Sequence, residues 1–113
     1  MDISPELGEK IQELQILERN SQTFSMEKQN FQIEANEIEN ALSELSKSEE
    51  VYKIINGLMI KSQKESLSKD LNERKKVLDI RINAIEKQEK SSQQKIDALR
   101  AEINSKFVTK SSN

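Results

Sequence analysis

The sequence predicts an all-α fold with one small β-hairpin, in which two long helices pair as an antiparallel coiled coil. Two segments, about residues 5–47 and 63–108, repeat apolar residues at helical spacing and contain almost no glycine or proline. A short apolar run separates them, with strands expected at about 51–55 and 58–62 on either side of Asn56 and Gly57. We expect a single domain over residues 1–113, in which residues 109–113 form a flexible tail.

The composition of the chain limits its fold and its chemistry. Hydrophobic residues make up 34% of the 113 residues and charged residues another 34%, a balance that suits narrow apolar seams on long helices. The chain has no cysteine and no histidine, which excludes disulfides, zinc sites with thiolate or imidazole ligands, and histidine acid–base chemistry. We therefore expect a protein that is not an enzyme and has no catalytic residues, no metal and no cofactor.

The sequence gives no sign of a membrane or secretory protein. Its N-terminus lacks a basic region followed by an apolar run, so we expect no signal peptide. No apolar stretch approaches the length of about 18 residues that a transmembrane helix needs. We expect a cytoplasmic protein.

The first helix is predicted to begin at Pro5, with Ser4 as its N-cap and Glu6 in its first turn. Apolar residues then recur at steps of three and four, as a coiled-coil seam requires. The expected seam is Leu7, Ile11, Leu14, Leu17, Ser21, Phe24, Lys28, Phe31, Ala35, Ile38, Leu42 and Leu45.

The second helix follows the hairpin directly. Ser62 and Glu65 have the spacing of a capping box, which predicts the start of this helix. Its expected seam is Leu67, Leu71, Arg74, Leu78, Ile82, Ile85, Glu89, Ser92, Ile96, Leu99 and Ile103, with Phe107 beyond it. Two successive steps of four around Leu78 form a stutter, which locally unwinds a left-handed coil.

The two seams match when the chain is folded at the hairpin. With the turn between Asn56 and Gly57, opposite residues have numbers that add up to about 113, so that Leu14 meets Leu99. The polar seam positions then fall together partway along the coil: Ser21, Lys28, Glu89 and Ser92. Such polar positions either let the helices separate or fix their register, and the sequence supports both interpretations equally.

Charge also favours pairing of the two helices. Residues 1–50 carry 4 Lys and Arg against 12 Asp and Glu, whereas residues 51–113 carry 14 against 8. An acidic helix beside a basic one selects its partner, although each exposed ion pair contributes little stability.

The hairpin is predicted to present two mainly apolar faces. Asn-Gly is the dipeptide that best tolerates the two positive φ angles of a type I′ turn. One face holds Val51, Ile55, Leu58 and Ile60 with Lys53, and the other holds Tyr52, Ile54 and Met59 with Lys61. Because a lone hairpin is marginally stable and its edges are unpaired, we expect hairpins from several subunits to join into a β-barrel. The alternative is an apolar loop folded back on its own helices.

The hairpin and parts of the second helix resemble prefoldin, in its β type with one hairpin per chain. The residues that carry the resemblance are Val51-Tyr52-Lys53, Gly57-Leu58-Met59-Ile60-Lys61, Leu71, Leu78, Arg81, Asn83-Ala84, Gln88-Glu89, Lys95 and Leu99. The resemblance implies an ATP-independent chaperone subunit in a hexamer of two α and four β subunits. Such a hexamer captures non-native proteins at the coiled-coil tips and delivers them to a group II chaperonin. The sequence contains no P-loop, in agreement with this role.

The ends of the two helices are the expected client-binding tips. Apolar residues gather there beyond what a two-helix seam can cover: Ile3, Leu7, Ile11, Ile16, Ile103, Phe107 and Val108. Exposed apolar tips suit weak capture of many different unfolded chains. The alternative is that these residues only seal the end of the coil, which is the interpretation we favour for the seam residues Leu14 and Leu99.

Two other functions are compatible with a coiled coil. A structural or tethering protein leaves the apolar hairpin unexplained. A nucleic-acid-binding arm would use the basic second helix, including Arg74, Lys75 and Lys76, as its phosphate contact. The acidic partner helix, the single tyrosine and the net charge of -2 disfavour nucleic acid as a partner.

Overall fold

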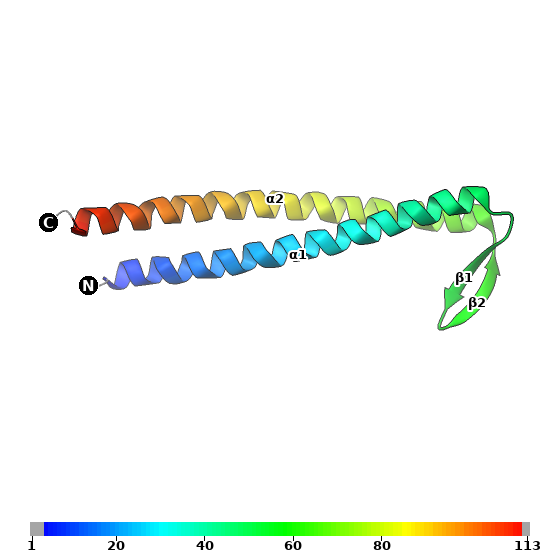
Figure 1. Cartoon of the computed structure of the whole chain (residues 1–113), viewed down its shortest axis with the longest axis horizontal. Helices are drawn as coiled ribbons and strands as arrows, with labels where there is room; N and C mark the ends of the chain where they lie inside the picture. Colours follow the sequence, from blue (N-terminus) through cyan, green and yellow to red (C-terminus); the bar gives the residue numbers. More distant parts are fainter. Residues whose placement is uncertain (1–3, 112–113) are drawn as a thin grey trace. The chain divides into compact units, whose positions relative to one another are not determined.

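The computed structural model describes residues 4–111, with side chains described up to residue 107. Helix α1 (Pro5–Lys47) is followed by strand β1 (Val51–Ile55), strand β2 (Leu58–Ser62) and helix α2 (Lys64–Ser111) (Figure 1). The two strands form one antiparallel sheet. The predicted fold class, two long helices joined by a hairpin, is confirmed.

The chain forms two compact units. Of the described residues, unit 1 holds 4–28 and 84–111, and unit 2 holds 29–83. Within each unit, a segment of α1 lies beside a segment of α2 and runs in the opposite direction (Figure 1). Unit 2 also contains the hairpin.

The start of α1 follows the sequence prediction. The Leu7 amide donates to the Ser4 hydroxyl at 3.2 Å, and the Gly8 amide donates to the Ser4 carbonyl at 2.9 Å. The Ser4 hydroxyl thus satisfies one of the amides that a helix N-terminus leaves without partners, and its carbonyl accepts the first intrahelical bond. At the other end, the Ser48 hydroxyl donates to the Glu44 carbonyl at 2.9 Å.

The start and end of α2 differ from the prediction. The capping box is wrong: the helix begins at Lys64, and the Ser62 hydroxyl instead donates to the Ile60 carbonyl at 3.4 Å. Ser62 is held in β2, opposite Val51, so its backbone is committed to the sheet. The helix also continues to Ser111, into the segment expected as a tail, because no glycine or proline follows Ile103 to stop it.

The predicted seam forms the core of both units. Unit 2 buries Ile38, Leu45 and Leu78, and unit 1 buries Leu7, Ile85, Ser92, Ile96 and Ile103. Every other seam position predicted for the described residues is half-buried, with one exception. The exception is Arg74, which is exposed.

The seam runs through Lys75 instead of Arg74, so two successive steps of four meet at Leu71 rather than at the predicted Leu78. Lys75 is half-buried in its place and bonds Glu39 at 2.7 Å, so its methylene stem covers the seam while its ammonium reaches water. Arg74 points outward, where its Nε atom donates to the Glu34 carboxylate at 3.0 Å. The prediction of Arg74 as a seam residue is therefore wrong by one position.

Contacts between the helices confirm the predicted register. In unit 1, Lys10 bonds Glu102, and the Lys28 ammonium lies 3.9 Å from the Glu86 carboxylate. In unit 2, the Arg81 guanidinium lies 5.8 Å from the centre of the Phe31 ring, a cation–π contact. Each of these pairs lies within one residue of the register that the turn at Asn56-Gly57 predicts.

The hairpin turn has the backbone that its sequence predicts. Asn56 has a φ of 49° and Gly57 a φ of 79°, the two positive values of a type I′ turn. This turn pairs Ile55 with Leu58 and Val51 with Ser62. The local turn therefore sets the register of the whole hairpin.

The two glycines should respond in opposite ways to the same substitution. A Cβ atom at Gly57 or at Gly8 meets nothing within 4 Å, so the backbone conformation alone distinguishes them. We expect Gly57→Ala to cost about 1–2 kcal/mol at its positive φ, and Gly8→Ala to stabilise α1 by roughly 0.5–1 kcal/mol.

Amide hydrogen exchange measures both effects, one in each variant. Gly57→Ala should speed exchange in β1 and β2, whereas Gly8→Ala should slow exchange in the first turns of α1. Unchanged protection of the hairpin in Gly57→Ala would contradict the role given to the turn.

Candidate functional site

The hairpin carries the largest group of exposed apolar residues in the part of the chain that the structure describes. Its pairing places Ile54 opposite Met59 and Ile55 opposite Leu58, which confirms the two predicted faces. Ile54 is 70% exposed and Met59 is 68% exposed. Tyr52, Ile55, Leu58 and Ile60 are also exposed. A group of exposed apolar side chains of this size marks a surface that binds another protein.

Val51 differs from the other residues predicted for this surface. It is only 8% exposed, because it lies at the start of β1 where the strand leaves the helices. A hollow beside it is lined by Leu45, Leu67 and Leu71 together with Tyr52. Val51 therefore anchors the hairpin to the helices of unit 2, and its part in assembly stays a prediction.

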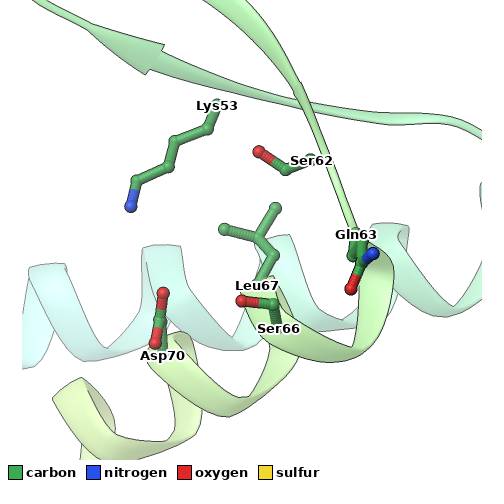
Figure 2. A pocket seen from close by; sticks show the side chains of 6 residues that line it. All are labelled: Lys53, Ser62, Gln63, Ser66, Leu67 and Asp70. Atoms are coloured by element: carbon green, nitrogen blue, oxygen red, sulfur yellow. The ribbon is translucent and has the colours of Figure 1, made fainter.

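A polar hollow lies between the hairpin and the start of α2. Its volume is about 200 Å³, and its walls come from Lys53 and Ser62 on the hairpin and from Gln63, Ser66, Leu67 and Asp70 beside it. Figure 2 shows the Lys53 ammonium pointing across the hollow toward the Asp70 carboxylate. Opposite charges on the two walls favour the placement of the hairpin against α2.

Polar contacts also hold the open end of the hairpin. The Tyr52 hydroxyl donates to the Glu50 carboxylate at 3.0 Å, and the Lys61 ammonium lies 3.7 Å from the same carboxylate. Tyr52 and Lys61 are cross-strand partners, so Glu50 joins both strands at that end. The apolar side chains between this end and the turn remain uncovered.

The helix ends in unit 1 are more closed than the sequence predicts. Leu7 is 1% exposed and Ile103 is also buried, so neither belongs to the apolar area that the sequence predicts to stay exposed, and their binding of clients stays a prediction. Both lie in the seam, where the partner helix covers them. Ile11 and Phe107 are half-buried, and Ile16 is exposed.

Two predicted tip residues fall outside this description. Ile3 lies outside the described residues. Val108 lies in α2, but its side chain is beyond the last described one.

A cluster of charges lies over the closed seam at these helix ends. Lys10 on α1 bonds Glu102 on α2, and the Lys106 ammonium lies 4.0 Å from the Glu6 carboxylate. The hydrogen bond from Lys10 holds the pKa of the Glu102 carboxyl below its ordinary value. The same bond raises the pKa of Lys10, and the nearby Lys10 ammonium lowers the pKa of Lys106. The cluster joins the two helices through charge.

Four exposed apolar residues on the helices escaped the sequence analysis. They are Met26, Ile33, Val77 and Ile80, of which Ile80 is 68% exposed. Their position in the sequence could have identified them, because each is an apolar residue outside the predicted seam. Off-seam apolar residues were predicted to bind another protein only near the helix ends.

The described residues offer no site for metal chemistry. Among them, no three acidic, cysteine or histidine side chains gather in a way that could hold a metal ion. None of the described helices is long and apolar enough to cross a membrane.

Most of this chain is similar in sequence to known proteins. The family model described as "Prefoldin subunit" matches residues 8–110. The chain belongs to the prefoldin family. It is 33% identical over 105 residues to the prefoldin subunit beta of Saccharolobus islandicus (strain L.S.2.15 / Lassen #1), covering 90% of this chain and 83% of that protein. It is 31% identical to the prefoldin subunit beta of Thermococcus onnurineus (strain NA1), covering 90% of both chains.

A solved prefoldin structure confirms the fold. The crystal structure of the prefoldin beta subunit from Thermococcus strain KS-1 has a TM-score of 0.84 and 31% sequence identity to this chain. The match covers 92% of this chain and 94% of that one. The one-hairpin prefoldin fold expected from the resemblance is therefore confirmed, and the chain is a prefoldin chaperone subunit.

The charge cluster predicts how unit 1 responds to acid. Because the pKa of Glu102 is lowered by folding, its contribution to stability is present above the ordinary carboxyl pKa and is lost as the pH falls through the lowered value. Glu102→Gln should therefore lower the melting temperature at pH 7, and the difference from wild type should shrink at a pH low enough to protonate the Glu102 carboxyl.

Glu9→Gln is the matched control, because Glu9 lies at an exposed position of α1 outside the cluster. Thermal unfolding followed by circular dichroism at both pH values measures the two variants. A Glu102→Gln effect that is equal at both pH values would rule out the proposed role of charge.

Proposed function

We propose that this prefoldin subunit assembles through its hairpin with prefoldin α subunits and holds non-native proteins without ATP. We further propose that the assembly works in the cytoplasm and passes its clients to a group II chaperonin. The observation that carries this proposal is the exposed apolar hairpin.

The hairpin supports assembly because a two-stranded sheet has unpaired edges and uncovered faces. Two strands alone leave one row of backbone groups unpaired at each edge, and a lone hairpin is marginally stable in water. Its two faces expose Tyr52, Ile54 and Met59 on one side and Ile55, Leu58 and Ile60 on the other. Hairpins joined edge to edge in a barrel would pair the edges and cover the inner face. The family resemblance implies a hexamer of two α and four β subunits.

The helix ends of unit 1 support client binding. Ile16 stands exposed on α1, and Phe107 on α2 is half-buried. Weak apolar contacts of this kind bind unfolded chains without requiring a particular sequence. Leu7, Ile11 and Ile103 would add to this surface whenever the helix ends separate.

The pairing of charges disfavours nucleic acid as the partner. Arg74 and Lys75, which lie in the most basic stretch of α2, bond Glu34 and Glu39 of α1. A phosphate backbone would have to displace these carboxylates to reach the basic residues.

Assembly should depend on the hairpin face that holds Ile54 and Met59. Ile54→Lys combined with Met59→Lys places two ammonium groups at a cross-strand pair and should prevent assembly with a co-expressed prefoldin α subunit. Ile80→Lys is the matched control, because Ile80 is similarly exposed but lies on α2. Sedimentation velocity should show separate chains for the double variant and a complete assembly for the control. A complete assembly in both would refute the barrel.

Client capture should depend on the helix ends. Removal of residues 1–10 and 104–113 should abolish the suppression of client aggregation while the assembly persists. At single residues, Ile16→Ser should weaken suppression several-fold, whereas Met26→Ser, an equally exposed change away from the helix ends, should not. The measurement is light scattering of a denatured client diluted into the assembled chaperone. Full suppression by the truncated chain would overturn the tip proposal.

A further inference from the structure

Ser92 is the one polar residue among the buried residues of the described chain. It is 6% exposed, whereas the other buried positions hold leucine, isoleucine or valine. Its hydroxyl makes no hydrogen bond to any residue that the structure describes. A buried hydroxyl without a hydrogen-bond partner carries a desolvation cost. This cost lowers the stability of the closed coil relative to any state in which water can solvate the hydroxyl.

The layers around Ser92 are also poorly packed. Ser21 is the residue expected opposite Ser92, and it is half-buried. Beside Ser92 lies a hollow of about 220 Å³, lined by Leu17, Asn20, Phe24, Gln88, Ser91, Ser92 and Lys95. The two small serine side chains fill less space in the seam than aliphatic residues would, and Leu17 and Phe24 line the hollow beside them.

An ion pair spans the next two layers toward unit 2, because the register places Glu89 opposite Phe24 and Lys28 opposite Ile85. The Lys28 ammonium lies 3.2 Å from the Glu89 carboxylate, and both side chains are part of the seam. Water can solvate these charges if the helices separate, so these layers oppose separation less than apolar layers would. The serine layer is therefore followed by two layers that each hold a charged residue.

The seam on the far side of these layers is apolar. Ile96, Ile103 and Leu7 are buried there, and they include two of the residues expected to bind clients. These side chains can contact a client only if the two helices of unit 1 separate.

We propose that Ser92 sets how readily unit 1 opens, and that opening exposes Leu7, Ile96 and Ile103 to extended apolar segments of a non-native protein. This inference rests on the proposed chaperone function. Ser92 acts as a positioning residue: it touches no client and instead controls the access of a client to the seam. An aliphatic side chain at this seam position would close the coil, and the serine does not.

The first test fills the weak layer. Ser92→Leu supplies the apolar side chain that the neighbouring seam positions carry, and should slow amide exchange of residues 93–107 by about tenfold or more. Exchange in unit 2 should not change. The same variant, assembled with the α subunit, should suppress client aggregation several-fold less well than wild type. Gln94→Leu is the matched control, because it adds a leucine at an exposed position of α2 that does not line the hollow.

The second test closes the seam covalently, which is possible because the chain has no cysteine. Leu14→Cys with Leu99→Cys places two thiols at positions that the register pairs in unit 1. The oxidised assembly should lose client capture, and reduction of the same sample should restore it. Leu42→Cys with Leu71→Cys places the corresponding pair in unit 2 and should leave capture unchanged.

The outcomes separate this inference from the proposed function. If the oxidised Leu14–Leu99 pair captures clients as well as the reduced form does, clients do not use the seam and the inference fails while the chaperone function stands. Unchanged exchange in a folded Ser92→Leu chain would also overturn it. If wild type and every reduced variant fail to suppress aggregation, the chaperone function itself fails. In that case slower exchange in Ser92→Leu would still support the role of Ser92 in opening.

Discussion

A two-helix coil buries a single stripe on each helix, and the rest of the structure depends on this constraint. In the described part of the chain, no third element covers Ile80 on the outer face of α2, so this apolar residue outside the stripe is exposed to solvent. Each seam position therefore contributes a large share of the stability of the coil, because few residues hold the helices together. One serine in the stripe therefore matters more here than it would in a globular core.

The parts of the fold that depend on local sequence could be predicted from it. The Asn56-Gly57 turn requires positive φ angles at both positions, and this requirement determines the strand pairing and then the helix register. The heptad spacing identifies the seam in the same way. These features need only neighbouring residues, so a single sequence is enough to find them.

The parts that depend on competition between elements could not be predicted. Ser62 suits a helix cap, but pairing with Val51 holds it in the sheet. Arg74 fits the seam by spacing, but Lys75 takes the seam position and Arg74 is exposed. Leu7 is buried at the start of α1. Spacing along one helix does not determine which of two neighbouring positions faces the other helix, nor how far that helix covers it.

The hairpin also bears on the order in which the chain folds. Residues that meet across the coil near the hairpin are close in sequence: Lys64 and Ser46 are 18 positions apart, whereas Lys10 and Glu102 are 92 apart. Loop-closure entropy is smallest for the first pair, and each later pair closes onto a coil already formed. The chain should zip from the turn outward and unzip in reverse. Thermal motion alone can then open and close the last pairs to form, as the proposed release of a client without ATP would require.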